Sequence, residues 1–316
     1  MFKKTIKISL VLTFCTLMLN DTYSQRRKVY RAGETTPTTT IIKKDSAEKK
    51  KKPNRPKEKF CNCNNDLQFD PTTNIALDKN IKGTPPFTGK CVTFFENKKL
   101  EMQLSFVNGK EEGTWFFFYK TGTPKIIKNY AEGKAHGKWT AFEKDSVVFW
   151  EKNYFMGEKH GKQTYYYLNG NKKKTEEFIM GVKEGKFEQF YKEGGLKKIV
   201  GYKKNKFDGI YQKYSKDSIL IIEKEYEEGV INGVDNSYFD DGSISYKTSY
   251  IKGIPDGKWV FNNEDGTIYK TEEYKKGKKT GEWKEYYNNG KLKSEIIYKK
   301  DQVVSKKEYD KFGKEK

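Results

Sequence analysis

The chain has 316 residues, of which 34% are hydrophobic and 15% aromatic, and its formal net charge is +20. Large rings must therefore provide most of the apolar burial, and a single deep aliphatic core is excluded as the main source of stability. With 34% charged residues a random sequence would tend to disorder, but a strict period argues against disorder from about residue 85 onward.

Residues 1–24 are typical of a secretory signal peptide. Three lysines precede the apolar run from Ile8 to Leu19, and Thr22 and Ser24 place small residues at positions −3 and −1 of a cut before Gln25. The run is shorter than the roughly 20 residues that span a bilayer, so a permanent anchor is the weaker interpretation. Cys15 is compatible with a lipoprotein signal peptide, but such signals carry a small residue before the cysteine and this chain has Phe14 there. We expect export to the periplasm, the cell surface or the medium.

Residues 25–59 are predicted to be a disordered basic linker. They contain a threonine-rich stretch, four consecutive lysines and three prolines, with no periodic apolar pattern. Thirteen Lys or Arg against four Asp or Glu give this segment a charge of +9. Such a tail attracts anionic lipid, acidic polysaccharide or other polyanions in a salt-sensitive way. It is interpreted either as a solvated spacer or as a weak adhesive segment, and nucleic acid is disfavoured as a partner because export removes the chain from its usual targets.

Residues 60–84 are expected to cap one end of the repeats that follow. Three cysteines remain after signal cleavage: Cys61, Cys63 and Cys91. A Cys-x-Cys motif followed by a lone cysteine lacks the second half of a zinc site, and neither histidine lies near it in the sequence. In an oxidising compartment one disulfide from Cys61 or Cys63 to Cys91 is favoured over free thiols and over a metal, and the third thiol would be left over.

A unit of 24 residues recurs through the remainder of the chain. The first repeated position of the unit holds a residue type that tolerates a left-handed backbone, so we expect one turn with a positive φ in each unit. These residues are Gly109, Gly133, Gly157, Gly181, Asn205, Gly229, Gly253, Gly277 and Asp301. A second glycine follows four residues later. The aromatic marks include Trp115, Trp139, Trp259, Trp283, Tyr130, Tyr154, Tyr202, Tyr226, Tyr250, Tyr274 and Tyr298.

Each unit is predicted to form a β-hairpin. In the last full unit, residues 283–287 contain no breaker, Asn288-Asn289-Gly290 is a turn signal, and alternate residues from Leu292 to Tyr298 are spaced for one strand face. The links between units are too short for a crossover helix. The predicted fold class is therefore all-β, with tandem 24-residue hairpins in an elongated, twisted antiparallel sheet of roughly 90 Å.

The first strand of each unit poses a question, because its aromatic residues are three apart. Trp283 and Tyr286 show this spacing, as do Trp115 and Phe118. Strict alternation would place the two rings on opposite faces of the sheet. Either a bulge brings both rings to one face, or both faces carry aromatic residues, and the sequence does not choose between them.

No catalytic or metal-binding arrangement is predicted, and no cofactor. His136 and His160 are 24 residues apart and occupy the same position in adjacent units, so about 10 Å would separate them, too far to share a metal. Their plain interpretation is as loop residues, and no nucleophile–histidine pair is evident. Carboxylates are frequent but alternate with lysines, as on solvated faces.

The segment Gly277 to Leu292 resembles the MORN repeat in its longer bacterial variant, whose members often carry the label YwqK-type toxin-antitoxin antitoxin. The resemblance covers residues 85 to about 313 and makes 85–316 the repeat domain. It implies elongated hairpin sheets, protein–protein contact, phospholipid association in some members, and no catalytic residues. The unit is interrupted where other residues replace aromatics or turn glycines: Gln163, Asp235, Asn262, Ser146 and Ser218.

These features predict an exported, non-enzymatic scaffold that binds a protein or an envelope surface through its aromatic and lysine-rich face. The first alternative is an anionic lipid or polyanion binder that acts through the basic linker. The second is an antitoxin-like binding protein, which export disfavours because antitoxins act on cytoplasmic toxins. No small-molecule substrate is expected.

Overall fold

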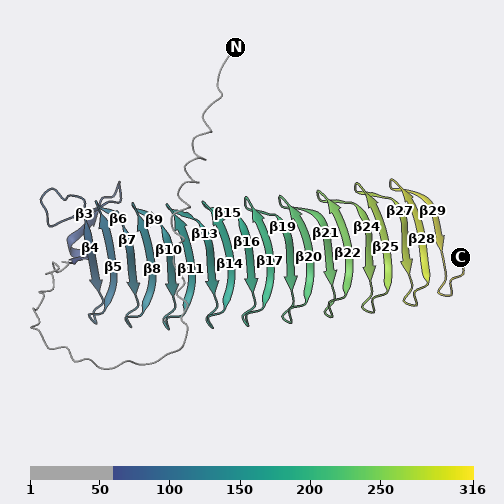
Figure 1. Ribbon diagram of the computed structural model, residues 1–316, viewed down its shortest axis with the longest axis horizontal. Helices are drawn as coiled ribbons and strands as arrows, with labels where there is room; N and C mark the ends of the chain where they lie inside the picture. The colour runs from purple at the N-terminus through teal and green to yellow at the C-terminus, as the bar shows by residue number, and fades with distance from the viewer. Residues whose placement is uncertain (1–59) are drawn as a thin grey trace, which may run out of the picture. The chain divides into compact units, whose positions relative to one another are not determined.

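The computed structural model describes residues 60–316, and they form an open, elongated sheet of 27 strands with a small two-stranded sheet at one end (Figure 1). Neighbouring strands in the sequence pair antiparallel through the whole repeat region, so the predicted all-β fold is confirmed. The predicted signal peptide and basic linker lie outside the described residues. No helix in the described part of the chain is long and apolar enough to cross a membrane.

Each unit contributes a six-residue strand, an eight-residue strand and, in most units, a two-residue strand before them. The six-residue strands are β4 (Gly89–Phe94), β7 (Gly113–Phe118), β10 (Gly137–Phe142), β13 (Gly161–Tyr166), β16 (Gly185–Phe190), β19 (Gly209–Tyr214), β24 (Gly257–Asn262) and β27 (Gly281–Tyr286). The eight-residue strands are β5 (Leu100–Val107), β8 (Pro124–Ala131), β11 (Val148–Phe155), β14 (Lys172–Ile179), β17 (Leu196–Lys203), β20 (Leu220–Glu227), β22 (Ile244–Ile251), β25 (Ile268–Lys275) and β28 (Leu292–Lys299). The short strands are β6 (Lys110–Glu111), β9 (Lys134–Ala135), β12 (Glu158–Lys159), β15 (Val182–Lys183), β18 (Lys206–Phe207), β23 (Ile254–Pro255) and β26 (Lys278–Lys279). Two strands depart from this scheme, β21 (Val230–Tyr238) and the last strand β29 (Gln302–Glu308).

The link between units is a two-residue turn in which both residues are left-handed. At the link after β8, Glu132 has φ 51° and Gly133 has φ 78°. Two successive positive φ values define the type I′ turn, whose twist matches that of antiparallel strands. The sequence predicted only the second residue of each pair. The first is Asn at position 108 and Glu, Met or Lys in the other units, and Glu, Met and Lys give no sign of the left-handed backbone.

A bulge follows each of these tight turns. The second glycine of the unit, such as Gly137 with φ 70°, begins the six-residue strand after a one-residue break. Across the break, Ala135 pairs with Tyr130 while Thr140 pairs with Ile127, so one strand carries two extra residues. The ladder between successive units is therefore irregular at the bulge, where the His136 N–H donates to the Asn129 carbonyl at 2.9 Å.

The opposite ends of the strands are joined by wider turns, each with one left-handed residue. Gly170 has φ 83°, and Ser146 and Ser218 take the same conformation with φ 68° and 66°. The two serines thus stand where other units have glycine, as the sequence indicates. Tyrosine hydroxyls join neighbouring wide turns, as when Tyr119 donates to the Phe142 carbonyl at 2.8 Å.

Ring contacts answer the question of the three-residue spacing. Trp115 packs against Phe117 at 6.4 Å between ring centroids, and Phe116 packs against Phe118 at 6.4 Å. A register shift does occur between Phe117 and Phe118, but it leaves Phe118 with Phe116 and away from Trp115. Both faces of the sheet therefore carry aromatic residues.

The largest apolar core lies at the N-terminal end, under residues 60–84. This segment contains β1 (Cys61–Asn62), the single-turn helix α1 (Cys63–Asp66) and the hairpin of β2 (Leu67–Phe69) and β3 (Ala76–Asp78). Strand β1 pairs parallel with β4, and a disulfide joins Cys63 to Cys91 with 5.1 Å between their Cα atoms. The buried cluster comprises Leu67, Ala76, Phe87, Cys91, Leu104 and Phe106.

We expect Ser146→Gly to stabilise the fold by about 1 kcal/mol, because a left-handed residue with a Cβ atom costs roughly that much. The reciprocal change, Gly170→Ser, should destabilise it by a similar amount, since a Cβ at Gly170 meets no heavy atom within 4 Å and only the backbone is strained. Midpoints of urea unfolding followed by circular dichroism measure both. Shifts of the two variants in the same direction would contradict this account.

We expect Cys63→Ala to destabilise the N-terminal end by about 3 kcal/mol, the usual effect of a disulfide that closes a loop of this size. Cys61→Ala is the control and should have little effect. Burial, with nearby Asp66 and Asp78, raises the pKa of the Cys61 thiol to about 11, which keeps it protonated and slow to exchange. Thermal unfolding and non-reducing peptide mapping are the measurements, and loss of the disulfide in Cys61→Ala would refute the pairing.

Candidate binding face

One face of the sheet, which we call the aromatic face, carries two columns of rings that alternate along the sheet. Trp115 lies 4.7 Å from Tyr130, Tyr130 lies 5.2 Å from Trp139, and Trp139 lies 4.7 Å from Tyr154, between ring centroids. The same contacts return from Tyr250 through Trp259, Tyr274 and Trp283 to Tyr298. These rings are half-buried, mainly by one another. Burial raises the pKa of Tyr130 to about 12, so its hydroxyl stays protonated.

The tryptophans also donate hydrogen bonds between units. The indole N–H of Trp139 donates to the Asn129 carbonyl at 2.7 Å, and that of Trp283 donates to the Glu273 carbonyl at 3.0 Å. Each acceptor lies ten residues earlier, on the far side of the bulge. Each acceptor also receives a backbone N–H, from His136 and Thr280 respectively, so the indole adds a second hydrogen bond across the bulge.

Gln163 replaces tryptophan in this column and keeps its hydrogen bond. Its amide Nε2 donates to the Asn153 carbonyl at 2.9 Å, again ten residues earlier, and its Oε1 accepts from the Asn153 N–H at 3.2 Å. The side chain is fully buried. The unit is regular in its backbone here, although the stack of rings is interrupted.

Asp235 interrupts the column in a different way. Its carboxylate accepts from Lys224 Nζ at 2.9 Å and from the Tyr246 hydroxyl at 3.3 Å. The small side chain lets Asp235 pair directly with Lys224 in the ladder, and β21 runs on without the usual break. Burial lowers the pKa of Lys224, but the hydrogen bond and charge of Asp235 outweigh it and the pKa lies above its usual value. The offset of two extra residues is kept in this unit, since Tyr226 pairs with Ile231 and Lys224 with Asp235, so the unit departs from the others in its continuous strand and not in its register.

Six lysines of the aromatic face, which we call the lysine patch, lie over rings between β8 and β17. They are Lys128, Lys152, Lys159, Lys174, Lys183 and Lys198. Their Nζ atoms lie over Trp139 at 4.7 Å, Trp150 at 4.3 Å, Phe178 at 5.0 Å, Tyr165 at 4.4 Å, Tyr202 at 5.1 Å and Phe187 at 5.0 Å, in that order. All six contacts fall within the range of cation–π attraction.

Negative charge is scarce in this patch. By strand alternation, the only carboxylate on the aromatic face from β8 to β17 is Glu176, which gives this half a net charge of +5. Glu176 accepts from Lys174 at 3.1 Å and from Lys183 at 3.0 Å. From β19 to β28 the same face carries Lys213, Lys224, Lys270 and Lys279 against Asp235, Glu272 and Glu285, a net charge of +1. Positive charge is therefore concentrated in the N-terminal half of the repeats.

The lysines of the patch also act on one another. Burial lowers the pKa of Lys152, and the charges of Lys159 and Lys174 lower it further. Burial lowers the pKa of Lys198, with smaller contributions from Lys197 and Lys183. Like charges held together on a partly buried surface are unfavourable until an anion neutralises them.

The opposite face, which we call the polar face, balances its charges internally. Lys138 forms an ion pair with Glu151, and the Tyr166 hydroxyl donates to the same carboxylate at 3.0 Å. Further along, Lys284 bonds to Glu295 at 3.1 Å. This arrangement is that of a solvated surface.

The histidines have a structural environment. The rings of His136 and His160 lie on either side of Phe155, at 5.3 and 5.7 Å between centroids. Among residues 60–316 there is no group of three or more His, Cys, Asp or Glu side chains placed to hold a metal ion.

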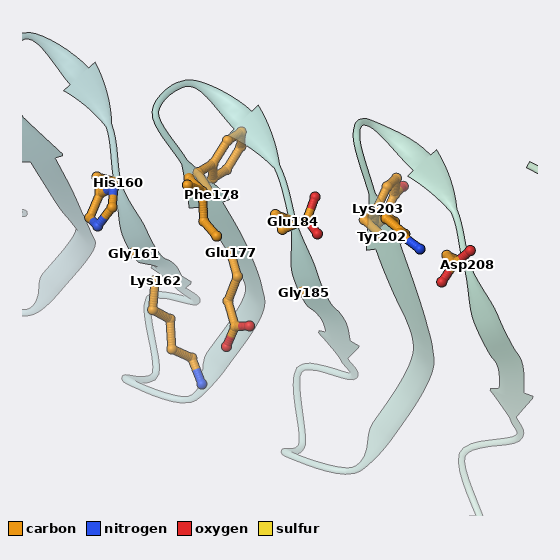
Figure 2. A pocket seen from close by; sticks show the side chains of 11 residues that line it. His160, Gly161, Lys162, Glu177, Phe178, Glu184, Gly185, Tyr202, Lys203 and Asp208 are labelled. Carbon is orange, nitrogen blue, oxygen red and sulfur yellow. The ribbon is translucent and has the colours of Figure 1, made fainter. Parts of the chain in front are cut away.

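His160 also borders an open depression of about 590 Å³ at the tight-turn edge, where His160, Glu184 and Asp208 follow one another from successive units (Figure 2). The acids that line it already have partners. Glu184 accepts from the Lys204 N–H at 2.8 Å, and Glu177 accepts from the Lys186 N–H at 3.0 Å. These carboxylates cap the backbone of the turns, so the depression offers no free acid–base pair.

The structure places the predicted residues in distinct groups. The turn residues Gly109, Gly133, Gly157, Gly181, Gly229, Gly253 and Gly277 lie along one edge, and the predicted tryptophans and tyrosines together form the aromatic face. Cys63 and Cys91 are joined, and Cys61 is the free cysteine of the described residues. Sequence reasoning missed the lysine patch, although the period of 24 in Lys128 and Lys152 was a signal for it. These two lysines also lie two residues before Tyr130 and Tyr154, so strand alternation places them on the same face as the rings.

Known proteins resemble the chain in two ways. A family model described as "MORN repeat variant" matches residues 87–108, 111–132, 159–179 and 279–300. No curated protein matches the chain significantly. Among solved structures, the crystal structure of TcdB2-TccC3 is 11% identical with a TM-score of 0.21, covering 73% of this chain and 16% of that one. The structure of the Photorhabdus luminescens Tc holotoxin pore is 9% identical with a TM-score of 0.15, covering 79% of this chain and 15% of that one.

The chain thus spans a small part of the length of those two structures. The four family matches start in the same 24-residue register as the units between them, and all four fall on hairpins of the sheet. The label of YwqK-type antitoxin receives no such match. On its repeat, its register and its fold, this chain contains MORN repeats of the variant type.

Proposed function

We propose that this MORN-repeat protein is an exported, non-enzymatic scaffold that binds a protein or an envelope surface through its aromatic face. The observation that carries this proposal is the aromatic face itself, which runs from β7 to β28. Strands of the described chain contact their neighbours in the sheet, and beyond the N-terminal cap no further element packs over this face. A long row of half-buried rings with lysines between them has the composition of a contact surface.

Binding is favoured over catalysis because carboxylates on both faces are engaged in ion pairs and hydrogen bonds. Glu151 and Glu176 bond to lysines, and Glu184 bonds to a backbone N–H. A glycosidase would need a pair of carboxylates flanking a substrate site, with one pKa raised. Burial alone would raise the pKa of Glu176, but hydrogen bonds from Lys183 and Lys174 bring it below its usual value. That shift suits an ion pair and not a general acid.

Two observations support export. The first 24 residues have the charge and apolar pattern of a signal peptide. The Cys63–Cys91 disulfide suits an oxidising compartment. The antitoxin-like alternative requires a cytoplasmic partner and has neither observation in its favour.

The second candidate is a polyanion or anionic lipid binder that acts through residues 25–59. The charge of +9 in this segment favours it. The two functions differ in their response to salt, because a linker-driven interaction should collapse as ionic strength rises, whereas docking on the aromatic face should largely persist.

We expect a pull-down from native envelope extract to capture one defined protein or envelope component with the mature chain. Capture should survive high salt and deletion of residues 25–59, because rings and not diffuse charge would provide the affinity. Mass spectrometry of the captured material is the measurement. If capture is lost on deletion of residues 25–59 or at high salt, the linker and not the aromatic face is the binding element.

Two adjacent tyrosines of β13 provide a matched pair for this experiment. Tyr165 lies on the aromatic face under Lys174, and Tyr166 lies on the polar face against Glu151. Both are half-buried. Tyr165→Ser should weaken capture about tenfold, the usual effect of removing an interface ring, and Tyr166→Ser should leave it unchanged. The reverse result would assign binding to the polar face.

A further inference from the structure

The lysine patch is periodic along the sheet. It consists of three pairs at equivalent positions of adjacent units: Lys128 with Lys152, Lys159 with Lys183, and Lys174 with Lys198. One unit adds two strands to the sheet at about 4.8 Å each, so each pair is separated by about 9.6 Å. The patch is therefore a set of parallel rows of positive charge with a fixed spacing, running across the strands.

The rows lack counter-charges. No carboxylate of the described residues forms an ion pair with Lys128, Lys152, Lys159 or Lys198. The remaining two share Glu176. The opposite arrangement on the C-terminal half, where Lys224 pairs with Asp235 and Lys270 with Glu272, shows that the same fold can neutralise such lysines internally. The patch is left positive, which fits an anionic partner.

We propose that the lysine patch binds an extended acidic segment of a partner protein, in polyproline II conformation, with a carboxylate at every third residue. This inference rests on the proposed function and adds the chemical class of the partner. A polyproline II chain advances about 3.1 Å per residue with three residues per turn, so every third side chain recurs at about 9.3 Å. Over the patch, the difference from the 9.6 Å spacing of the units sums to about 1 Å, well within the reach of a lysine side chain.

The rings complete the match. Polyproline II segments dock on surfaces lined with aromatic residues, because their rigid backbone loses little entropy on binding. Trp139, Trp150, Tyr165 and Phe187 lie beneath lysines of the patch. A segment with prolines between its acids would place apolar rings on these aromatic residues and its carboxylates on the lysines. Both components of the patch would then be used by one ligand.

A membrane surface fits the patch less well. The side chains of Lys174 and Lys183 are only 34% and 32% exposed, because they lie along the rings and do not project from the sheet. Lipid head groups in a plane reach ammonium groups that protrude, whereas a single extended chain can settle among these lysines. The periodic spacing likewise distinguishes a regular chain from a diffuse anionic surface.

The test uses the full chain and a synthetic peptide of repeated Pro-Pro-Glu triplets. Binding is followed through tryptophan fluorescence, since Trp139 and Trp150 lie under Lys128 and Lys152. A peptide of the same composition with its glutamates grouped together is the control for charge, and it contacts the basic linker equally. We expect the triplet peptide to bind at least about tenfold more tightly, as several matched charge-assisted contacts imply.

Matched variants locate the site. The double variant Lys152→Gln with Lys198→Gln should weaken binding of the triplet peptide about tenfold or more. Lys270→Gln with Lys279→Gln is the control, because these lysines are half-buried on the same face and lie over rings in the C-terminal half. The control should bind as the unaltered chain does. Independently of any variant, the triplet peptide should protect Lys152 and Lys198 from acetylation while Lys270 and Lys279 react, as read by mass spectrometry.

Several results would overturn the inference. Equal affinities for the two peptides would show that the spacing of the glutamates does not matter. An equal loss of affinity in both double variants would show that the lysine patch is not the binding site. Tighter binding of polygalacturonate, or of vesicles containing phosphatidylserine, than of the triplet peptide would assign the patch to a polysaccharide or to a membrane. If the peptide fails to bind while envelope capture still depends on Tyr165, this inference falls and the proposed function stands.

Discussion

The structure depends on a backbone hydrogen bond that crosses each bulge and joins a unit to the one before it, as when the His136 N–H donates to the Asn129 carbonyl. Where the unit has tryptophan, the indole N–H donates to the same carbonyl, ten residues earlier. An unpaired backbone carbonyl at this place would be costly, and here it accepts two hydrogen bonds. Gln163 lacks the aromatic ring and keeps the side-chain donor, whereas Phe187 keeps the ring and the backbone hydrogen bond alone.

The aromatic face follows from the same geometry. Because the sheet is a single layer, its rings cover one another and half of each ring stays open to a partner, where a layered fold would have enclosed it. The proposed binding would therefore use side chains that also stabilise the sheet. The polar face differs, because Glu151 there is already bonded to Lys138 and Tyr166.

Periodicity alone predicted the fold, because few folds other than tandem β-hairpins accommodate turn glycines and aromatic residues that repeat every 24 residues. It did not predict the left-handed backbone at Glu132 or Lys276, since the tight turn imposes that conformation on whichever residue precedes the glycine. It also left open the faces of Trp115 and Phe118, which depend on strand register. Part of the lysine patch was within reach of the sequence, because Lys128 and Lys152 lie two residues before Tyr130 and Tyr154 on the same strands. Lys159 and Lys183 lie beyond a tight turn, and their face follows only from the strand register.

The two ends of the described sheet differ in how firmly they are held. The first hairpin is tied by the Cys63–Cys91 disulfide and seated on a buried cluster, whereas β29 pairs only with β28 and exposes Val303 and Val304. Since each unit is held by its neighbours, loss of β29 uncovers the next hairpin in turn. Mechanical load or a processive protease would thus unravel the sheet stepwise from its C-terminal end, one unit at a time. The disulfide end would be the last to yield.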